Sequence, residues 1–68
     1  MKLNNYLKVW RAKREITQAD LAKSVGLSRQ TINSIEKGKF IPSVLSAMKI
    51  STYFETSIEE IFYIKEEK

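Results

Sequence analysis

The sequence predicts a single all-α domain, residues 1–68, built from five short helices. The first supporting observation is that residues favoured at helix starts, Thr17, Ser28 and Ser43, each precede a segment with apolar residues at helical spacing. The second is that Gly26 and Gly38 follow two of these segments, where a helix commonly ends in a left-handed residue. The third is the length, which suits one small core.

The first helix is expected to run to about Lys13, with Asn4 or Asn5 as its capping residue. The second helix is expected at about 18–25, because Thr17 and Asp20 have the spacing of a capping box. Gly26 then fits the left-handed position that ends this helix.

The third helix follows a turn of about three residues and is capped by Ser28. Ile32 and Ile35 are one helical step apart, so both are expected to point inward, and Gly38 ends the segment. The face opposite the two isoleucines is polar throughout.

Pro42 separates the third helix from a fourth, which is expected at about 44–54. Its inward stripe is predicted from spacing to contain Val44, Ala47, Met48, Ser51 and Phe54.

A second capping box, from Ser57 to Glu60, predicts a short fifth helix that carries Ile58, Ile61 and Phe62. The two chain ends contain β-favouring residues, at 2–3 and 63–64. A small antiparallel pairing of the N- and C-terminal ends is therefore an open alternative to a purely helical fold.

The composition argues against an enzyme. The chain has no cysteine and no histidine, so disulfides, the usual zinc sites and Cys or His nucleophiles are excluded. Glu59 and Glu60 are adjacent and would face different directions on a helix, so a hydrolase is the weakest alternative. We expect no catalytic residue, no metal, no cofactor and no small-molecule ligand.

No apolar run approaches the roughly 20 residues that a membrane helix needs, and no signal peptide is recognisable. We therefore expect a cytoplasmic protein with no membrane partner.

The charges are unevenly distributed along the chain. Residues 1–39 carry nine Lys or Arg and three acidic residues, a balance of +6, whereas residues 40–68 carry three Lys and five Glu, a balance of −2. These balances add up to the net charge of +4. A basic half beside an acidic half indicates one side that faces a polyanion, although ordinary solvating charge would give the same count.

The segment 18–37 has the pattern of a helix-turn-helix. Ala22 is small where the two helices would cross, and Gly26 lies in the turn, where a side chain at positive φ is costly. The buried positions of this pattern are filled by apolar residues: Leu21, Val25, Leu27, Ile32 and Ile35.

The stretch TQADLAKSVGLSRQTINSIEKGKFIPS resembles the core signature of the Cro/CI-type (Xre) repressor family, and the similarity extends from about residue 7 to 62. The resemblance implies a lambda-repressor-like, five-helix DNA-binding domain that regulates transcription, in most cases as a repressor. Its partner would be double-stranded DNA.

The resemblance also implies which residues contact DNA. The third helix would enter the major groove, and its base contacts are predicted to be Arg29, Gln30, Asn33 and Ser34. The phosphate contacts are predicted to be Thr17, Gln18, Ser28, Thr31, Lys37 and Lys39, although Thr17 and Ser28 also fit a purely capping role. Arg11 and Glu36 are expected to form a structural ion pair.

The C-terminal half contains more apolar residues than one small core needs. A two-fold dimer would cover them and would place two third helices about 34 Å apart, one turn of DNA. The predicted dimer interface contains Leu45, Tyr53, Ile61, Phe62, Tyr63 and Ile64.

The other class of function that fits is an interaction module, such as an antitoxin whose DNA binding is autoregulatory. Its exposed C-terminal apolar run would then contact a different protein.

Overall fold

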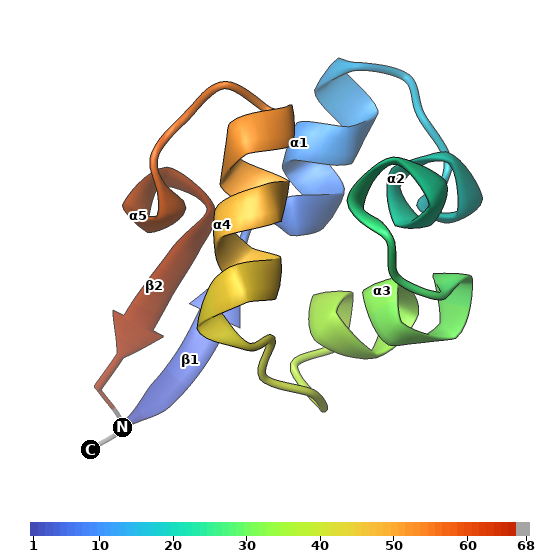
Figure 1. Ribbon diagram of the computed structural model, residues 1–68. Helices are drawn as coiled ribbons and strands as arrows, with labels where there is room; N and C mark the ends of the chain where they lie inside the picture. Colours follow the sequence, from blue (N-terminus) through green and yellow to red (C-terminus); the bar gives the residue numbers. More distant parts are fainter. Residues whose placement is uncertain (67–68) are drawn as a thin grey trace.

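The computed structural model describes residues 1–66, and the last two residues of the predicted domain 1–68 lie outside this range. Along the chain, the elements are β1 (Lys2–Asn5), α1 (Leu7–Lys13), α2 (Gln18–Val25), α3 (Arg29–Glu36), α4 (Val44–Tyr53), α5 (Ile58–Ile61) and β2 (Phe62–Lys65). In Figure 1, α1 and α4 form the centre, α2 and α3 pack together on one side, and the two strands lie on the other. The fold thus has the five predicted helices and a small sheet.

The sheet confirms the pairing that the β-favouring ends left open. β1 and β2 are antiparallel, with a register from Lys2 opposite Lys65 to Asn5 opposite Phe62. The rings of Tyr6 and Tyr63 stack beside it, with centroids 4.6 Å apart. The N-terminal residues therefore form a strand before α1 begins.

The start of α1 depends on Asn5 rather than Asn4. The N-cap position is occupied by Tyr6, which makes no side-chain cap, but Oδ1 of Asn5 accepts from the amide of Leu7 at 3.1 Å. The same side chain donates through Nδ2 to the carbonyl of Ile35 at 2.9 Å. One asparagine thereby connects β1, α1 and the last turn of α3.

The two helices of the helix-turn-helix begin and end where the sequence predicts. Thr17 and Asp20 form the reciprocal capping box of α2, and Ser28 caps α3. Gly26 and Gly38 both have positive φ, 72° and 74°. Ala22 is buried, so the two helices approach closely.

The predicted inward stripe of α4 is partly wrong. Ala47, Ser51 and Phe54 are buried as expected, but Val44 and Met48 are 76% and 53% exposed, and Ile50 is buried instead. Two inward stripes fit a helical period on this segment. One contains residues 44, 47, 48 and 51, and the other contains residues 47, 50, 51 and 54. Packing against α2 and α5 selects the second.

The short α5 lacks the capping box that the sequence predicts. Ser57 occupies the N-cap position without a side-chain bond, and its backbone carbonyl accepts from the amide of Glu60 at 3.2 Å. Phe62 belongs to β2 rather than to α5.

The buried hydrophobic side chains form one core cluster. Its largest fully buried side chains are Leu7, Leu21, Ile32, Ile35, Ile50, Phe54 and Ile61. Within residues 1–66, no helix is long and apolar enough to cross a membrane.

Candidate nucleic-acid interface

The outer face of α3 is polar because its apolar residues are committed to the core. Ile32 and Ile35 are buried, whereas Arg29, Gln30 and Lys37 are exposed. This is the distribution that the sequence predicts for a helix with one side free to contact a ligand.

The first turn of α3 is fixed by two hydroxyl groups. Oγ of Ser28 accepts from the amide of Thr31 at 3.0 Å and shares a 2.8 Å hydrogen bond with Oγ1 of the same residue. The main role of Ser28 is therefore to cap the helix. Since one of the two hydroxyls donates to the other, one hydroxyl hydrogen remains to donate outward.

The N-terminal ends of α2 and α3 lie close together. Arg29 lines a surface hollow that is also lined by Thr17, Gln18 and Ala19. The amide of Asp20 donates to the side chain of Thr17 and the amide of Leu21 donates to its carbonyl, and among residues 1–66 no acceptor bonds the amides of Gln18 and Ala19. Unpaired amides at a positive helix end favour an anion such as a phosphate.

The sequence predicts that the side chain of Gln18 contacts a phosphate, but in the structure this side chain is bonded within the protein. Its Nε2 donates to Oδ1 of Asn33 and to Oε1 of Glu36, both at 3.1 Å. These two bonds use both hydrogens of the amide group. In this conformation the backbone amides at the N-terminal end of α2, and not the Gln18 side chain, can donate to a phosphate there.

Arg11 and Glu36 form the expected ion pair. Nε of Arg11 lies 2.7 Å from Oε2 of Glu36, and Nη2 donates to Oε1 at 3.1 Å. The hydrogen bond to Glu36 raises the pKa of Arg11, although burial acts in the opposite direction. Arg11 is thus used inside the protein, in the ion pair with Glu36.

The C-terminal end of α3 presents two further lysines. Lys37 and Lys39 are exposed, and the backbone around them is held by the carbonyl of Ser34, which accepts from the amides of Lys39 and Phe40. Ser34 itself is half-buried, as is Asn33. Both lie on the same helix as Arg29 and Gln30, about one turn further along.

The structure adds one lysine to the basic residues predicted near the C-terminal end of α3. Lys2 lines a hollow together with Lys37 and Gly38, because the β1–β2 pairing brings the chain start beside the end of α3. The signal in the sequence was the β-favouring start itself, which placed Lys2 in a strand but not beside Lys37.

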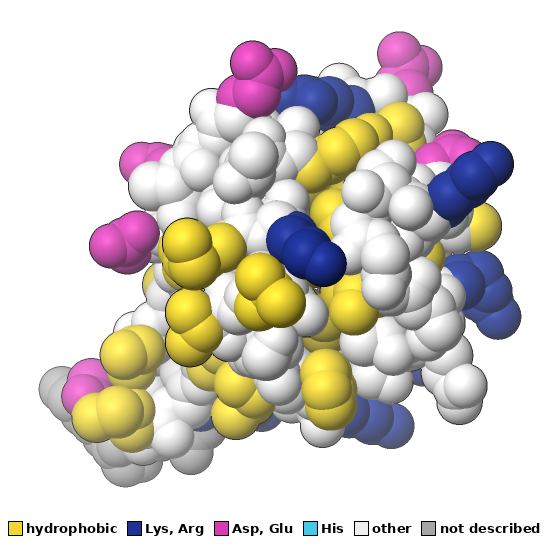
Figure 2. Space-filling model, viewed as in Figure 1, with side chains coloured by type: hydrophobic (Ala, Val, Ile, Leu, Met, Phe, Trp, Pro, Cys, Tyr) yellow, Lys and Arg dark blue, Asp and Glu magenta, His cyan; other side chains and the backbone are white. Residues whose placement is uncertain are grey.

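The predicted dimer residues separate into two groups. Ile61 and Phe62 are buried in the core of the single chain, so their assignment to an interface is wrong. Leu45 and Ile64 are 63% and 62% exposed, while Tyr53 and Tyr63 are half-buried. Hydrophobic side chains gather over α4 and towards the strands in Figure 2. Val44 and Met48 of α4 are also exposed.

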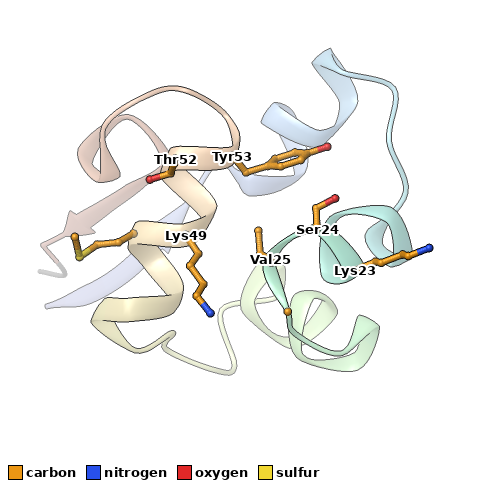
Figure 3. Close-up of a pocket in the computed structure, with 8 residues that line it drawn as sticks. Lys23, Ser24, Val25, Lys49, Thr52 and Tyr53 are labelled. Carbon is orange, nitrogen blue, oxygen red and sulfur yellow. The ribbon is translucent and has the colours of Figure 1, made fainter.

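A third hollow, of about 630 Å³, lies between the C-terminal end of α2 and α4 (Figure 3). Tyr53 extends from α4 towards α2, while Lys23 points away from α4. None of the predicted DNA contacts lines it. Within residues 1–66, no cluster of three or more acidic residues, His or Cys is placed to hold a metal ion.

These features define a helix-turn-helix domain, and comparison with known proteins gives the family. The helix-turn-helix family model matches residues 7–61. An uncharacterised HTH-type transcriptional regulator of Methanocaldococcus jannaschii is 48% identical over 66 residues, 97% of this chain and 100% of that one. The uncharacterised regulator YgzD of Bacillus subtilis is 40% identical over 65 residues, 96% and 98% of the two chains.

Among solved structures, the P22 c2 repressor in complex with a synthetic operator aligns with a TM-score of 0.75 at 28% identity, covering 78% of this chain and 80% of that one. The chain therefore belongs to the Cro/CI-type helix-turn-helix family. It is a transcriptional regulator with a repressor-like fold, and its relatives are regulators rather than enzymes.

Proposed function

We propose that the protein is a sequence-specific repressor that binds a palindromic DNA operator as a homodimer, with α3 in the major groove. The observation that carries this proposal is the arrangement of α2 and α3. The buried Ile32 and Ile35 hold α3 so that Arg29 and Gln30 face outward, beside the free amides at the start of α2.

Base reading would come from the exposed first turn of α3. The guanidinium of Arg29 can donate to guanine O6 and N7, and the amide of Gln30 can pair with adenine N6 and N7. Both side chains project from a helix whose cap and core contacts fix its position. Asn33 and Ser34 stay candidates for the second turn.

Phosphate contacts would flank these base contacts at both ends of α3. At its start, the amides of Gln18 and Ala19 and the hydroxyls of Thr17, Ser28 or Thr31 can donate. At its end, exposed cations are available in the side chains of Lys37, Lys39 and Lys2. These contacts would supply affinity without reading sequence.

The proposed dimer would use the exposed apolar side chains of α4 and β2. Leu45 and Met48 are one helical step apart on α4, and Ile64 is exposed on β2. The half-buried rings of Tyr53 and Tyr63 would complete the surface. The resemblance to small stand-alone family members, among them the dimeric cytolysin-operon repressor, supports two copies arranged about a two-fold axis.

The test is selection of bound sites from random duplex DNA, together with light scattering. We expect a two-fold consensus with half-sites about one helical turn apart and a mass twice the 7.9 kDa of one chain. Leu45→Glu and Ile64→Glu should shift the mass towards the monomer. Val9→Glu, a matched change at an exposed apolar residue of α1, should not.

Two outcomes would contradict the proposal. A consensus without two-fold symmetry would exclude the palindromic operator. A loose or aggregating monomer would favour the interaction module, whose apolar surface contacts a different protein.

A further inference from the structure

The hydrogen bonds between α1, α2 and α3 form a chain whose donor and acceptor roles are fixed by chemistry. It begins at Glu36, whose side chain is 6% exposed and accepts from Arg11. A carboxylate beside a guanidinium only accepts, so the Gln18 amide must turn its NH₂ group towards Glu36.

The next bond in the chain fixes Asn33. The same Nε2 of Gln18 lies 3.1 Å from the Asn33 side chain. Because an NH₂ group only donates, Asn33 must present its Oδ1 to Gln18 and turn its Nδ2 away.

The outward nitrogen of Asn33 is free to donate to a ligand. Within residues 1–66, no acceptor bonds Nδ2 of Asn33, and no buried side-chain nitrogen or oxygen lacks a partner. Nδ2 therefore reaches solvent, on the helix that carries Arg29 and Gln30.

We propose that Gln18 is a positioning residue for base reading: by holding Oδ1 of Asn33, it presents Nδ2 outward as a donor, which selects guanine over adenine at the base pair that Asn33 faces. This inference rests on the proposed function. An unconstrained asparagine pairs with adenine by using its oxygen and nitrogen together, whereas guanine offers two adjacent acceptors, O6 and N7, to a donor. Adenine N6 would place a donor against the outward NH₂ group.

Gln18→Met tests the proposal because it keeps the length of the side chain and removes its hydrogen bonds. Freed from Gln18, Asn33 can turn its oxygen outward, so the guanine-to-adenine preference at its base pair should fall about tenfold, the size of one good base contact. Preferences at the other base pairs should stay as they are. If Gln18 gripped a phosphate instead, the operator and random duplexes would weaken by the same factor, and the proposal would be wrong.

Gln30→Met is the matched control, since it is the same substitution at the other glutamine near the proposed interface. It should change the preference at a different base pair and leave the ratio at the Asn33 pair unchanged. Asn33→Asp gives a second variant: its outward atom becomes an acceptor, so preference should move from guanine to a base with an exocyclic amine, adenine or cytosine. A retained guanine preference would overturn the proposal.

A measurement without DNA separates this inference from the proposed function. In the free protein, both side-chain amide hydrogens of Gln18 should exchange with solvent more slowly than those of the exposed Gln30, by NMR. Equal exchange rates would overturn the proposed hydrogen-bond chain from Glu36 through Gln18 to Asn33, even if an operator is found. Slow exchange at Gln18 with no consensus from the wild-type protein would instead overturn the proposed function, and with it the reading role of Asn33.

Discussion

Arg11 on α1 and Glu36 at the end of α3 are 25 residues apart and are joined by hydrogen bonds of 2.7 and 3.1 Å. Arg11 also donates through Nη1 to the carbonyl of Ile16 at 3.0 Å, in the segment that leads into α2. One guanidinium thus links α1 to both helices of the helix-turn-helix.

Removal of this guanidinium should strongly destabilise the protein. Arg11→Met leaves the carboxylate of Glu36 in a buried site without its cation, which typically costs about 3–5 kcal/mol. Urea denaturation would measure the loss, with Lys8→Met, an exposed change on the same helix, as the control. The double variant Arg11→Met/Glu36→Leu should recover most of the stability, and a double variant as unstable as the single one would contradict this account.

Asn5→Ala should cost about 1–3 kcal/mol of unfolding free energy, because it leaves the carbonyl of Ile35 and the amide of Leu7 without their side-chain partner. Asn4→Ala is the matched control next to it in β1 and should change stability by less than about 0.5 kcal/mol. Thermal or urea unfolding of both variants checks the difference. Similar losses in the two would mean that the bonds of Asn5 contribute little.

Gly26→Ala should destabilise the protein by about 1–2 kcal/mol, through backbone conformation alone. The φ of Gly26 is 72°, and a Cβ built there meets no heavy atom within 4 Å. Asparagine tolerates the left-handed region better than alanine, so Gly26→Asn should cost less. An equal cost for both substitutions, measured by chemical denaturation, would point to a steric cause instead.

The capping box of α2 should make part of the stability depend on pH. The amide of Thr17 donates to Oδ2 of Asp20 at 3.1 Å, and this bond, together with the hydrogen bond to the Thr17 side chain, lowers the pKa of Asp20 below its ordinary 3.8. A carboxyl with a lowered pKa stabilises the fold above its ordinary value and loses that contribution as the pH falls through its folded value.

Asp20→Asn should therefore be less stable than the wild type at pH 7. The difference should shrink as the pH is lowered towards 2, because protonation of Asp20 removes its charge. Denaturation curves at the two pH values provide the measurement. A difference that is the same at both would show that the carboxylate charge is not the cause.

Arg29→Ala and Lys39→Ala should weaken DNA binding in different ways. Loss of a guanidinium that reads guanine should cost about 1–3 kcal/mol on the operator and relax selection at one base pair. Loss of the Lys39 charge should weaken binding to operator and random duplexes alike. It should also reduce the slope of log binding constant against log salt concentration by about the amount of one phosphate contact. Equal losses on specific and random duplexes for Arg29→Ala would remove it from the base contacts.

Much of the fold follows from local rules that the sequence displays directly. Thr17, Ser28 and the two glycines set the bounds of α2 and α3, because capping and left-handed backbone depend on residues within a few positions. The same local rule does not hold for α5, where Ser57 has the right spacing but its side chain makes no cap. A capping pattern permits the bond without requiring it.

The errors arise where local patterns allow more than one arrangement. Met48 and Ile50 are both apolar on α4, and only contact with α2 and α5 decides that Ile50 faces inward. The sequence predicts Ile61 and Phe62 at an interface because a continuous apolar run exceeds one face of a helix. The chain changes from helix to strand between them, which lets both residues enter the same core.

The sequence by itself determined the helix-turn-helix, its family and the polar character of α3, because these depend on spacing along a single segment. The tertiary structure alone decided how the polar side chains of separate helices are used. Gln18 and Asn33 are 15 residues apart, and each would suit a DNA contact when considered alone. Their meeting beside Glu36 determines which atoms remain to donate, because a hydrogen already shared within the protein is not available to DNA.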